Sequence, residues 1–304
     1  MRSTGFFSGH GGRLEFQESW QLRSTPDNIP ARITNENRRH MAMSQLLVQS
    51  NRGVLRVSLN RPDKRNALSR ELLGELLRTV FTAAGDSALR LLVLTGEGPV
   101  FCTGMDLTEM HEAASRPDAA SVFQSDSQLY RDVVARLIEL PVPVLAVLPG
   151  PAVAGGLGLV LACDLVIAAG TATFWLPEAR RGITAAMITP LLFHRCGLSA
   201  SSDLLLSGRQ VDAATALRYD LIHHVVPADQ LGATERDWIA NILAGSPGAV
   251  RDAKRLLHTA AWPQIARQLD AAVTISALAR QTLEAREGLN SFVQKRKPAW
   301  DLPR

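Results

Sequence analysis

The chain contains few cysteines, and they stand far apart. Only three occur among its 304 residues, Cys102, Cys163 and Cys196. No Cys-x-x-Cys pair and no Cys/His ligand spacing is present, which argues against a disulfide framework and against a zinc site. We therefore expect a protein of a reducing compartment, the cytoplasm, with no metal site.

Long runs of one chemical character are also missing. No apolar run reaches the roughly 18 residues of a membrane helix, and no basic run is long enough to indicate nucleic-acid binding. The formal charge of +4 is mild and is compatible with an anionic small ligand. We expect neither a membrane nor a nucleic acid as a partner.

The first 42 residues differ in character from the remainder. They are polar and irregular, without the apolar core of a secretory signal or the acid-poor composition of an organelle transit peptide. We expect residues 1–42 to form a disordered extension, and Met41 or Met43 to be an alternative start.

From residue 43 onward, β-rich and helical patterns alternate. The run 45–62 has two β-rich halves about Asn51-Arg52-Gly53, which indicates a hairpin. Leucines at helical spacing then lie between Ser69, a candidate N-cap, and Gly85, a candidate stop. Further strands are expected at 89–96, 143–150 and 164–169, and further helices at 107–115, 119–140 and 155–162.

The chain is mainly helical from about Ala185 to its end. The clearest amphipathic segments are 246–260 and 263–285. The pattern predicts an α/β fold, in which a β-rich body (residues 43–245) precedes a C-terminal helical region (residues 246–304).

Two glycine-containing loops stand out, GEGPVFCTGMDLTEM at 96–110 and AGGLGLVLACD at 154–164. Each follows an expected strand and precedes an expected helix, whose first N–H groups lack partners within the helix. Asp106 is well placed as the N-cap of the first helix. Two such N–H groups that meet at one point would form an oxyanion hole. Glycine turns before helices also occur simply to turn the chain, so spacing alone leaves both interpretations open.

Four motifs together resemble the crotonase (enoyl-CoA hydratase/isomerase) superfamily. They are LNRPDKRNALS, GPVFCTGMDLTEM, GPAVAGGLGLVLACDLVIA and FVQKRKPAW, in the order and spacing of that family. The likeness runs from about Leu46 to Trp300. It implies a spiral of β-β-α turns, followed by a helical region that builds trimers, often stacked as hexamers.

The resemblance also implies an acyl-CoA substrate and assigns its carbonyl to two amides. The residue before the loop aspartate, Met105, and a glycine of the second loop, Gly155, would donate N–H groups to the thioester oxygen. The coenzyme A belongs to the substrate thioester, so no separate cofactor is expected. An enolate held in this way needs an acid or base nearby to move protons.

The family's hydratases usually carry two glutamates, and only one is present here. The position three residues after Gly155 is Gly158, whereas the position fourteen residues after Asp164 is Glu178. Glu178 is thus the candidate acid–base residue, and the apolar run Phe174-Trp175-Leu176 would raise its pKa by desolvation. The alternative is a surface acid paired with a neighbouring arginine.

Further family positions suggest how coenzyme A would bind. Lys64, Arg65 and Ala67 match a loop that contacts the adenine and pantetheine, and Asp106 and Leu107 open the helix beside it. The motif near the C-terminus places Phe292 where the family stacks an aromatic ring on adenine, and Lys295 where a cation meets the 3′-phosphate. A solvated basic turn and a basic tail remain the alternatives.

Departures from the family pattern leave the reaction open. Pro149 and Ala154 replace a common asparagine and glycine, and TAAMITP at 184–190 replaces a glycine-rich turn beside the expected acyl pocket. We favour a hydratase acting on a 2-enoyl-CoA, with branched or glutaconyl-type thioesters among the candidates. The second hypothesis is a double-bond isomerase that uses Glu178 alone. The third hypothesis is a non-catalytic protein that binds acyl-CoA.

Overall fold

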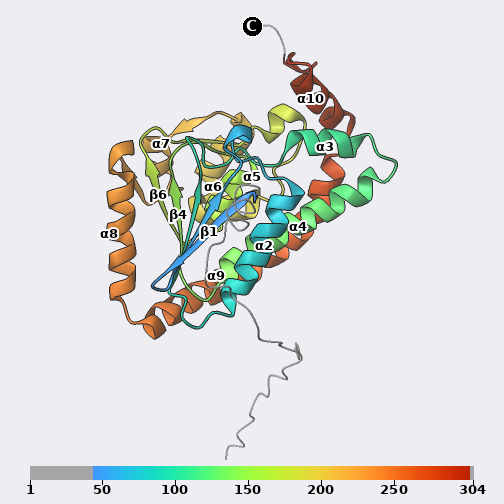
Figure 1. Cartoon of the computed structure of the whole chain (residues 1–304). Coiled ribbons are helices and arrows are strands. Elements are labelled where there is room, and N and C mark those ends of the chain that lie inside the picture. The colour runs from blue at the N-terminus through green and yellow to red at the C-terminus, as the bar shows by residue number, and fades with distance from the viewer. Residues whose placement is uncertain (1–43, 302–304) are drawn as a thin grey trace, which may run out of the picture. The chain divides into compact units, whose positions relative to one another are not determined.

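The computed structural model describes residues 44–301. The extension predicted for residues 1–42 lies outside the described residues. Between Ser44 and Asp301 the chain forms a mixed α/β structure with two β-sheets and helices that cover them (Figure 1). Within this range every helix is too short or too polar to cross a membrane.

The larger sheet has six strands in the order β1-β2-β3-β4-β6-β9, and the smaller has three in the order β5-β7-β8. In the larger sheet β1 and β2 are antiparallel and the other neighbours are parallel. Its strands are β1 (Leu46–Asn51), β2 (Val54–Leu59), β3 (Leu91–Gly96), β4 (Val144–Leu148), β6 (Leu165–Ala169) and β9 (His224–Val226). Those of the smaller sheet are β5 (Ala152–Val153), β7 (Thr173–Trp175) and β8 (Val211–Asp212).

The helices follow the strands in alternation and then dominate the C-terminal part. The helices are α2 (Arg70–Ala84), α3 (Leu107–Ala114), α4 (Ala119–Glu139), α5 (Gly155–Leu161), α6 (Thr189–Ser207), α7 (Ala213–Arg218), α8 (Leu231–Ala244), α9 (Pro247–Ala279) and α10 (Leu283–Val293). The 3-10 turns are η1 (Pro62–Lys64), η2 (Glu178–Arg181) and η3 (Ala228–Gln230). The predicted division after residue 245 stays a prediction, although α9 packs along α4 and contacts α6.

Helices cover both faces of the larger sheet, and this explains its long apolar strands. Successive side chains of a strand point to opposite faces, so every residue of β3 is buried. Leu92 and Leu94 join the main core with α2 and α4, whereas Leu91 and Val93 join a smaller cluster under α8. In Figure 1 α8 accordingly lies on one side of the strands and α2, α4 and α9 on the other.

Most of the expected local structure is confirmed. The hairpin turns at Arg52 and Gly53, both with positive φ. The Ser69 hydroxyl accepts a hydrogen bond from the Leu72 N–H at 3.1 Å, and α2 ends at Gly85. The Asp106 carboxylate caps α3 by accepting the Thr108 N–H at 3.0 Å.

The two amphipathic segments 246–260 and 263–285 are helical, and most of their length belongs to one helix. The helix α9 runs unbroken from Pro247 to Ala279 and contains Pro263. A proline inside a helix removes one backbone hydrogen bond, and the packing of α9 along α4 offsets that loss. The chain leaves the helix at Arg280–Thr282, where the Thr282 hydroxyl accepts the Ala285 N–H at 3.1 Å and starts α10.

Candidate functional site

The two glycine loops lie against each other through their backbones. Cys102 and Ala152 form an isolated parallel β-bridge. The Cys102 N–H donates to the Pro151 carbonyl at 3.2 Å, and the Val153 N–H donates to the Cys102 carbonyl at 2.9 Å. Residues about fifty apart in the sequence are thereby joined immediately before α3 and α5.

Gly104 brings the first loop into contact with the start of α5. Its φ is +83°, and a Cβ atom there would lie 2.9 Å from the Gly155 nitrogen and 2.8 Å from the Ala154 Cβ. Only glycine permits this approach without displacement. Ala154 itself has a φ of 51° and a ψ of −128°, a sparsely populated region that costs a non-glycine residue about 1–3 kcal/mol.

Two free amides result from this contact. Gly104 accepts a hydrogen bond from the Leu68 N–H at 2.8 Å, and the Asp106 N–H donates to the Leu68 carbonyl at 3.0 Å. Because alternate residues of an extended segment point to opposite sides, the Met105 N–H faces away from Leu68. Gly155 is the first residue of α5, where N–H groups have no partner within the helix. Within residues 44–301 neither amide donates a hydrogen bond, and both residues line one cavity of about 570 Å³.

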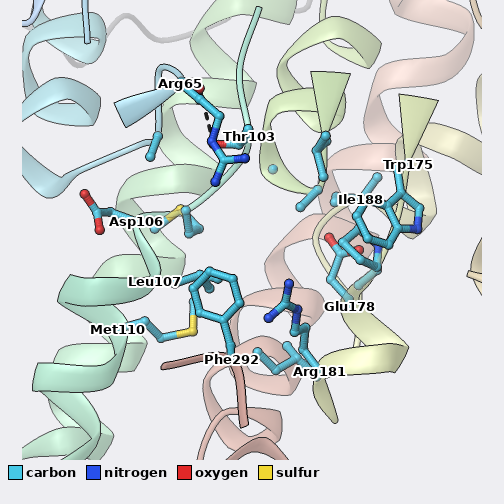
Figure 2. A pocket seen from close by; sticks show the side chains of 18 of the residues that line it. Arg65, Thr103, Asp106, Leu107, Met110, Trp175, Glu178, Arg181, Ile188 and Phe292 are labelled. Atoms are coloured by element: carbon cyan, nitrogen blue, oxygen red, sulfur yellow. Dashed lines mark hydrogen bonds between the residues drawn. The ribbon is translucent and has the colours of Figure 1, made fainter. Parts of the chain in front are cut away.

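Glu178 lines the same cavity. It begins the η2 turn, directly after β7, and Figure 2 shows its side chain beside Trp175 and Ile188. Its Oε2 atom is buried and has no hydrogen-bond partner within the described residues. Burial raises the pKa of Glu178 to about 7, so the carboxyl is close to half ionised at neutral pH.

The alternative in which Glu178 pairs with a neighbouring arginine does not hold in this structure. The Arg181 guanidinium lies over the Phe292 ring, 4.2 Å from its centre (Figure 2). Arg180 donates to the Ser207 carbonyl at 3.5 Å. Among the ion pairs found between Ser44 and Asp301, none includes Glu178.

The space beside Gly158 is filled by Tyr130 of α4. The Tyr130 hydroxyl donates to the Gly155 carbonyl at 2.7 Å. A Cβ atom at Gly158 would lie 2.0 Å from that hydroxyl oxygen, so no larger residue fits there while Tyr130 stays in place. The position where the family's hydratases usually carry a second acid therefore holds a phenol, and burial raises the pKa of Tyr130 well above its usual value.

Sequence reasoning missed Tyr130 because it stands in none of the four motifs. It lies on an unremarkable amphipathic helix, and only the packing of α4 on α5 brings it to the site. Other cavity-lining residues outside the four motifs that were missed in the same way include Arg181, Ile183, Ser276 and Arg280.

Most of the positions expected to bind coenzyme A also line the cavity. They are Lys64, Arg65, Ala67, Asp106, Leu107 and Phe292. The Thr103 hydroxyl donates to the Arg65 carbonyl at 3.2 Å, which ties the basic turn to the first glycine loop (Figure 2). Lys295 is the exception, since it is exposed and does not line the cavity.

The segment 184–190 forms part of the cavity wall. Ala185, Ala186, Met187 and Ile188 all line it, next to Glu178 in the chain. The departure of this segment from the family pattern therefore falls on the wall of the cavity itself.

Two cysteines near the loops are packing residues. Cys102 and Cys163 are fully buried, and burial raises the pKa of each thiol to about 12. A thiol with such a pKa is not ionised at neutral pH and is a poor nucleophile.

Comparison with known proteins identifies the family of the chain. The family model described as enoyl-CoA hydratase/isomerase matches residues 49–302. The chain is 34% identical over 257 residues to 2,3-dehydroadipyl-CoA hydratase of Escherichia coli, covering 84% of this chain and 98% of that protein. It is 32% identical over 251 residues to the mitochondrial enoyl-CoA hydratase domain-containing protein 3 of Mus musculus, covering 82% and 81%.

The solved structures lead to the same result. An enoyl-CoA hydratase/isomerase from Xanthobacter autotrophicus superposes with a TM-score of 0.76 at 29% identity, covering 86% of this chain and 99% of that one. An enoyl-CoA hydratase from Mycobacterium avium subsp. paratuberculosis gives 0.75 at 26% identity, covering 85% and 99%. The α/β body and its C-terminal helices thus have the crotonase fold, and the chain belongs to the enoyl-CoA hydratase/isomerase family.

Proposed function

We propose that this protein is an enoyl-CoA hydratase, which adds water across the double bond of a 2-enoyl-CoA thioester. The observation that carries the proposal is Glu178, a buried carboxyl with an unpartnered oxygen in the cavity that Met105 and Gly155 also line. The number of relatives named as hydratases supports the same choice.

In this proposal the Met105 and Gly155 amides hold the thioester oxygen. Each removed oxyanion donor typically costs about 3–4 kcal/mol of transition-state stabilisation. The two N–H groups favour the enolate, because negative charge on the oxygen grows as the reaction proceeds. The bulk of the cavity is available for the acyl chain and the pantetheine arm.

Glu178 alone would move the protons. Its carboxylate takes a proton from water as the water oxygen bonds to C3, and the electrons of the double bond pass to the thioester oxygen. The protonated carboxyl then gives its proton to C2, the carbonyl re-forms, and the carboxylate is restored. The net change is the addition of one water, and a pKa of about 7 suits both halves of this cycle.

The coenzyme A portion would lie across the basic turn. Lys64, Arg65 and Ala67 line one end of the cavity wall, and Arg181 stacked on Phe292 offers a further cation and an apolar surface. A guanidinium suits a phosphate through its paired donors. Lys295 keeps its proposed role near the 3′-phosphate only if the ligand extends beyond the cavity.

A double-bond isomerase is the second candidate, and Tyr130 is the observation that favours it. With a phenol rather than a carboxyl at the second position, one base remains. Isomerisation needs only one base, since Glu178 would take a proton from C2 of a 3-enoyl thioester and return it to C4 of the dienolate.

Product identity on two substrates distinguishes the candidates. A six-carbon 2-enoyl-CoA and its 3-enoyl isomer are incubated with the protein and the products are resolved by chromatography. We expect a 3-hydroxyacyl-CoA from the 2-enoyl substrate. Migration of the double bond without any hydroxy product would refute the hydratase and establish the isomerase.

The Glu178→Gln variant separates an enzyme from a binder. We expect kcat to fall about 100- to 10,000-fold, since the variant keeps the shape and loses the base, while the affinity for a saturated acyl-CoA changes little. Unchanged turnover would remove Glu178 from the proposal. Acyl-CoA binding with no turnover in the wild-type protein would instead support the non-catalytic reading.

A further inference from the structure

The cavity contains a buried cation that the proposed reaction does not use. Arg280 directly follows α9, is 6% exposed and lines the cavity. Ser276, one helical turn earlier on α9, is also buried and also lines it. Together they present a guanidinium and a hydroxyl to the cavity.

The Arg280 guanidinium has no hydrogen-bond partner within residues 44–301. Its Nε and Nη1 atoms are buried and unpartnered. Its Nη2 atom also makes no hydrogen bond but is not fully buried, so it is the nitrogen best placed to meet a ligand. The remaining contact is the Phe123 ring, whose centre lies 6.0 Å from the guanidinium carbon.

Asp126 is the carboxylate that attracts the Arg280 guanidinium, but it already forms hydrogen bonds to another arginine. Arg70 binds it with two bonds, from Nε to Oδ1 at 2.6 Å and from Nη2 to Oδ2 at 2.8 Å. Burial lowers the pKa of Arg280, and attraction to Asp126 only partly counters this. Arg70 also pairs with Glu109 at 3.6 Å. Asp126 therefore attracts Arg280 without forming a hydrogen bond to it.

An unsatisfied buried cation is costly to a fold, and a ligand of opposite charge would remove that cost. The Nε and Nη1 atoms have almost no accessible surface on any side, so a ligand can meet the guanidinium only through Nη2. The cavity is the route by which an anion can reach the group.

The position of Arg280 relative to the two amides sets the length of such a ligand. Tyr130 contacts Gly155, and Asp126 lies one turn earlier on α4, about 6 Å along the helix axis. Arg280 interacts with Asp126 and with Phe123, which lies one more turn away. Arg280 therefore lies beside α4 between one and two helical turns from Tyr130, about 6–10 Å along the helix axis, so a ligand that joins the two groups is short.

We propose that Arg280, assisted by Ser276, binds a carboxylate at the far end of the acyl chain, so that the preferred substrates are 2-enoyl-CoA thioesters of short dicarboxylic acids. The inference rests on the proposed function, since it requires the acyl group to enter this cavity. A charge-assisted hydrogen bond from the Nη2 atom, with the Ser276 hydroxyl beside it, suits a carboxylate.

Two substrates matched in length test the inference. One is a six-carbon 2-enoyl-CoA that ends in a methyl group, and the other is the six-carbon 2-enoyl-CoA that ends in a carboxylate. Wild-type protein, Arg280→Met and Arg280→Lys are compared by kcat/KM on both. Arg255→Met, on an exposed part of the same helix, serves as the matched control.

We expect the wild-type protein to prefer the carboxylate substrate at least tenfold. In Arg280→Met this preference is lost through a fall of about 10- to 100-fold on the carboxylate substrate alone. Arg280→Lys retains part of it, and Arg255→Met retains all of it. Equal losses on both substrates would overturn the inference, because they would assign Arg280 to coenzyme A binding or to folding.

Thermal unfolding provides a readout that separates ligand recognition from a structural role. Removal of an unpartnered buried cation is expected to leave the melting temperature of Arg280→Met unchanged or higher. A large decrease, with Arg280→Lys restoring it, would assign Arg280 a structural role and overturn the inference.

Binding measurements keep this inference separate from the proposed reaction. The saturated six-carbon acyl-CoA and its carboxylate counterpart are titrated calorimetrically into wild-type protein and Arg280→Met. Absence of turnover together with an Arg280-dependent preference for the carboxylate would refute the hydratase and support the inference. Turnover of both substrates without any preference would support the hydratase and refute the inference about Arg280.

Discussion

At the scale of single residues, the proposed chemistry depends on the environment of one carboxyl. Glu178 has an ordinary side chain, but its Oε2 is buried and unpartnered, and burial raises its pKa to about 7. A group that is half ionised near neutral pH can both accept and return a proton. The same burial has opposite consequences for activity and for stability.

Activity should depend on pH through this group. Because the ionised carboxylate starts the proposed hydration, kcat/KM should rise about tenfold per pH unit below the pKa and level off above pH 7. Initial rates with a 2-enoyl-CoA between pH 5 and 9 measure this. A profile with no inflection between pH 6 and 8 would contradict the assignment.

The free energy of unfolding should fall, rather than rise, as the pH increases. The folded-state pKa of Glu178, about 7, exceeds the ordinary value of 4.5, so between these values the unfolded chain loses the proton while the folded chain keeps it. Unfolding free energy therefore falls as pH rises through this window, by at most about 3 kcal/mol. Glu178→Gln should be more stable than wild type at pH 8 and similar at pH 4. Urea titrations at both pH values measure the difference, and equal stability at pH 8 would argue against a buried carboxyl.

At the scale of elements, the contact between α4 and α5 shapes the site. A Cβ at Gly158 would lie 2.0 Å from the Tyr130 hydroxyl but 3.3 Å from its Cζ atom, so the hydroxyl alone causes the severe overlap. The family's second acid cannot be introduced at position 158 without changing Tyr130 as well.

A double-mutant cycle tests this contact. Gly158→Ala should destabilise the protein by about 1–3 kcal/mol through overpacking. Tyr130→Phe should cost about 1 kcal/mol, since it removes the hydrogen bond to the Gly155 carbonyl. The double variant should be more stable than the sum predicts, by denaturant unfolding. Strict additivity would show that the two positions do not touch.

A second contact between elements holds α9 to the larger sheet. The Lys254 Nζ donates to the Asp164 carboxylate at 2.6 Å and to the Val142 carbonyl at 2.9 Å. Asp164 also accepts the Val144 N–H at 2.7 Å. Asp164, the aspartate from which the position of Glu178 was counted, therefore has a structural role of its own.

Loss of the Asp164 charge should leave a buried ammonium group without its counter-ion. We expect Asp164→Asn to destabilise the protein by about 3–5 kcal/mol, because Lys254 is buried. Adding Lys254→Met should recover part of this loss in urea unfolding. If the double variant were less stable than Asp164→Asn, the ion pair would not be the source of the effect.

At the scale of the whole molecule, several large apolar side chains of the C-terminal half are exposed. Leu206 is 83% exposed and Leu283 is 81% exposed. Others on α6 and α9 are Phe193, Leu198, Leu256, Leu257, Ile275 and Leu278. Exposed apolar surface of this kind is typical of protein contacts.

We predict that the chain assembles as a homotrimer, or as a homohexamer of two trimers. Light scattering after size exclusion should then give a mass three or six times the 33.0 kDa of the chain. The variants Leu283→Glu and Leu206→Glu indicate which surface forms the interface. The substitution that lies in the interface should lower the mass of the assembly measured by light scattering. A monomer at micromolar concentration would contradict the prediction.

How far the sequence alone reaches can be judged from particular residues. Local sequence signals correctly predicted Ser69 and Asp106 as helix N-caps and Gly85 as a helix end. These roles depend only on residues within one helical turn. At Pro263 the packing of α9 along α4 outweighs a residue that locally disfavours a helix. Motif spacing led to Glu178 through the resemblance to the family's hydratases, which usually carry a glutamate fourteen residues after the motif aspartate.

The sequence by itself determined the family, the fold class and the two loops, since these depend on residue types at fixed separations along the chain. Only the tertiary structure brought Tyr130 into the space beside Gly158 and left Arg280 without a partner in the cavity. Both side chains lie on amphipathic helices remote from the motifs. What they meet depends on how those helices pack, and no separation along the chain encodes that.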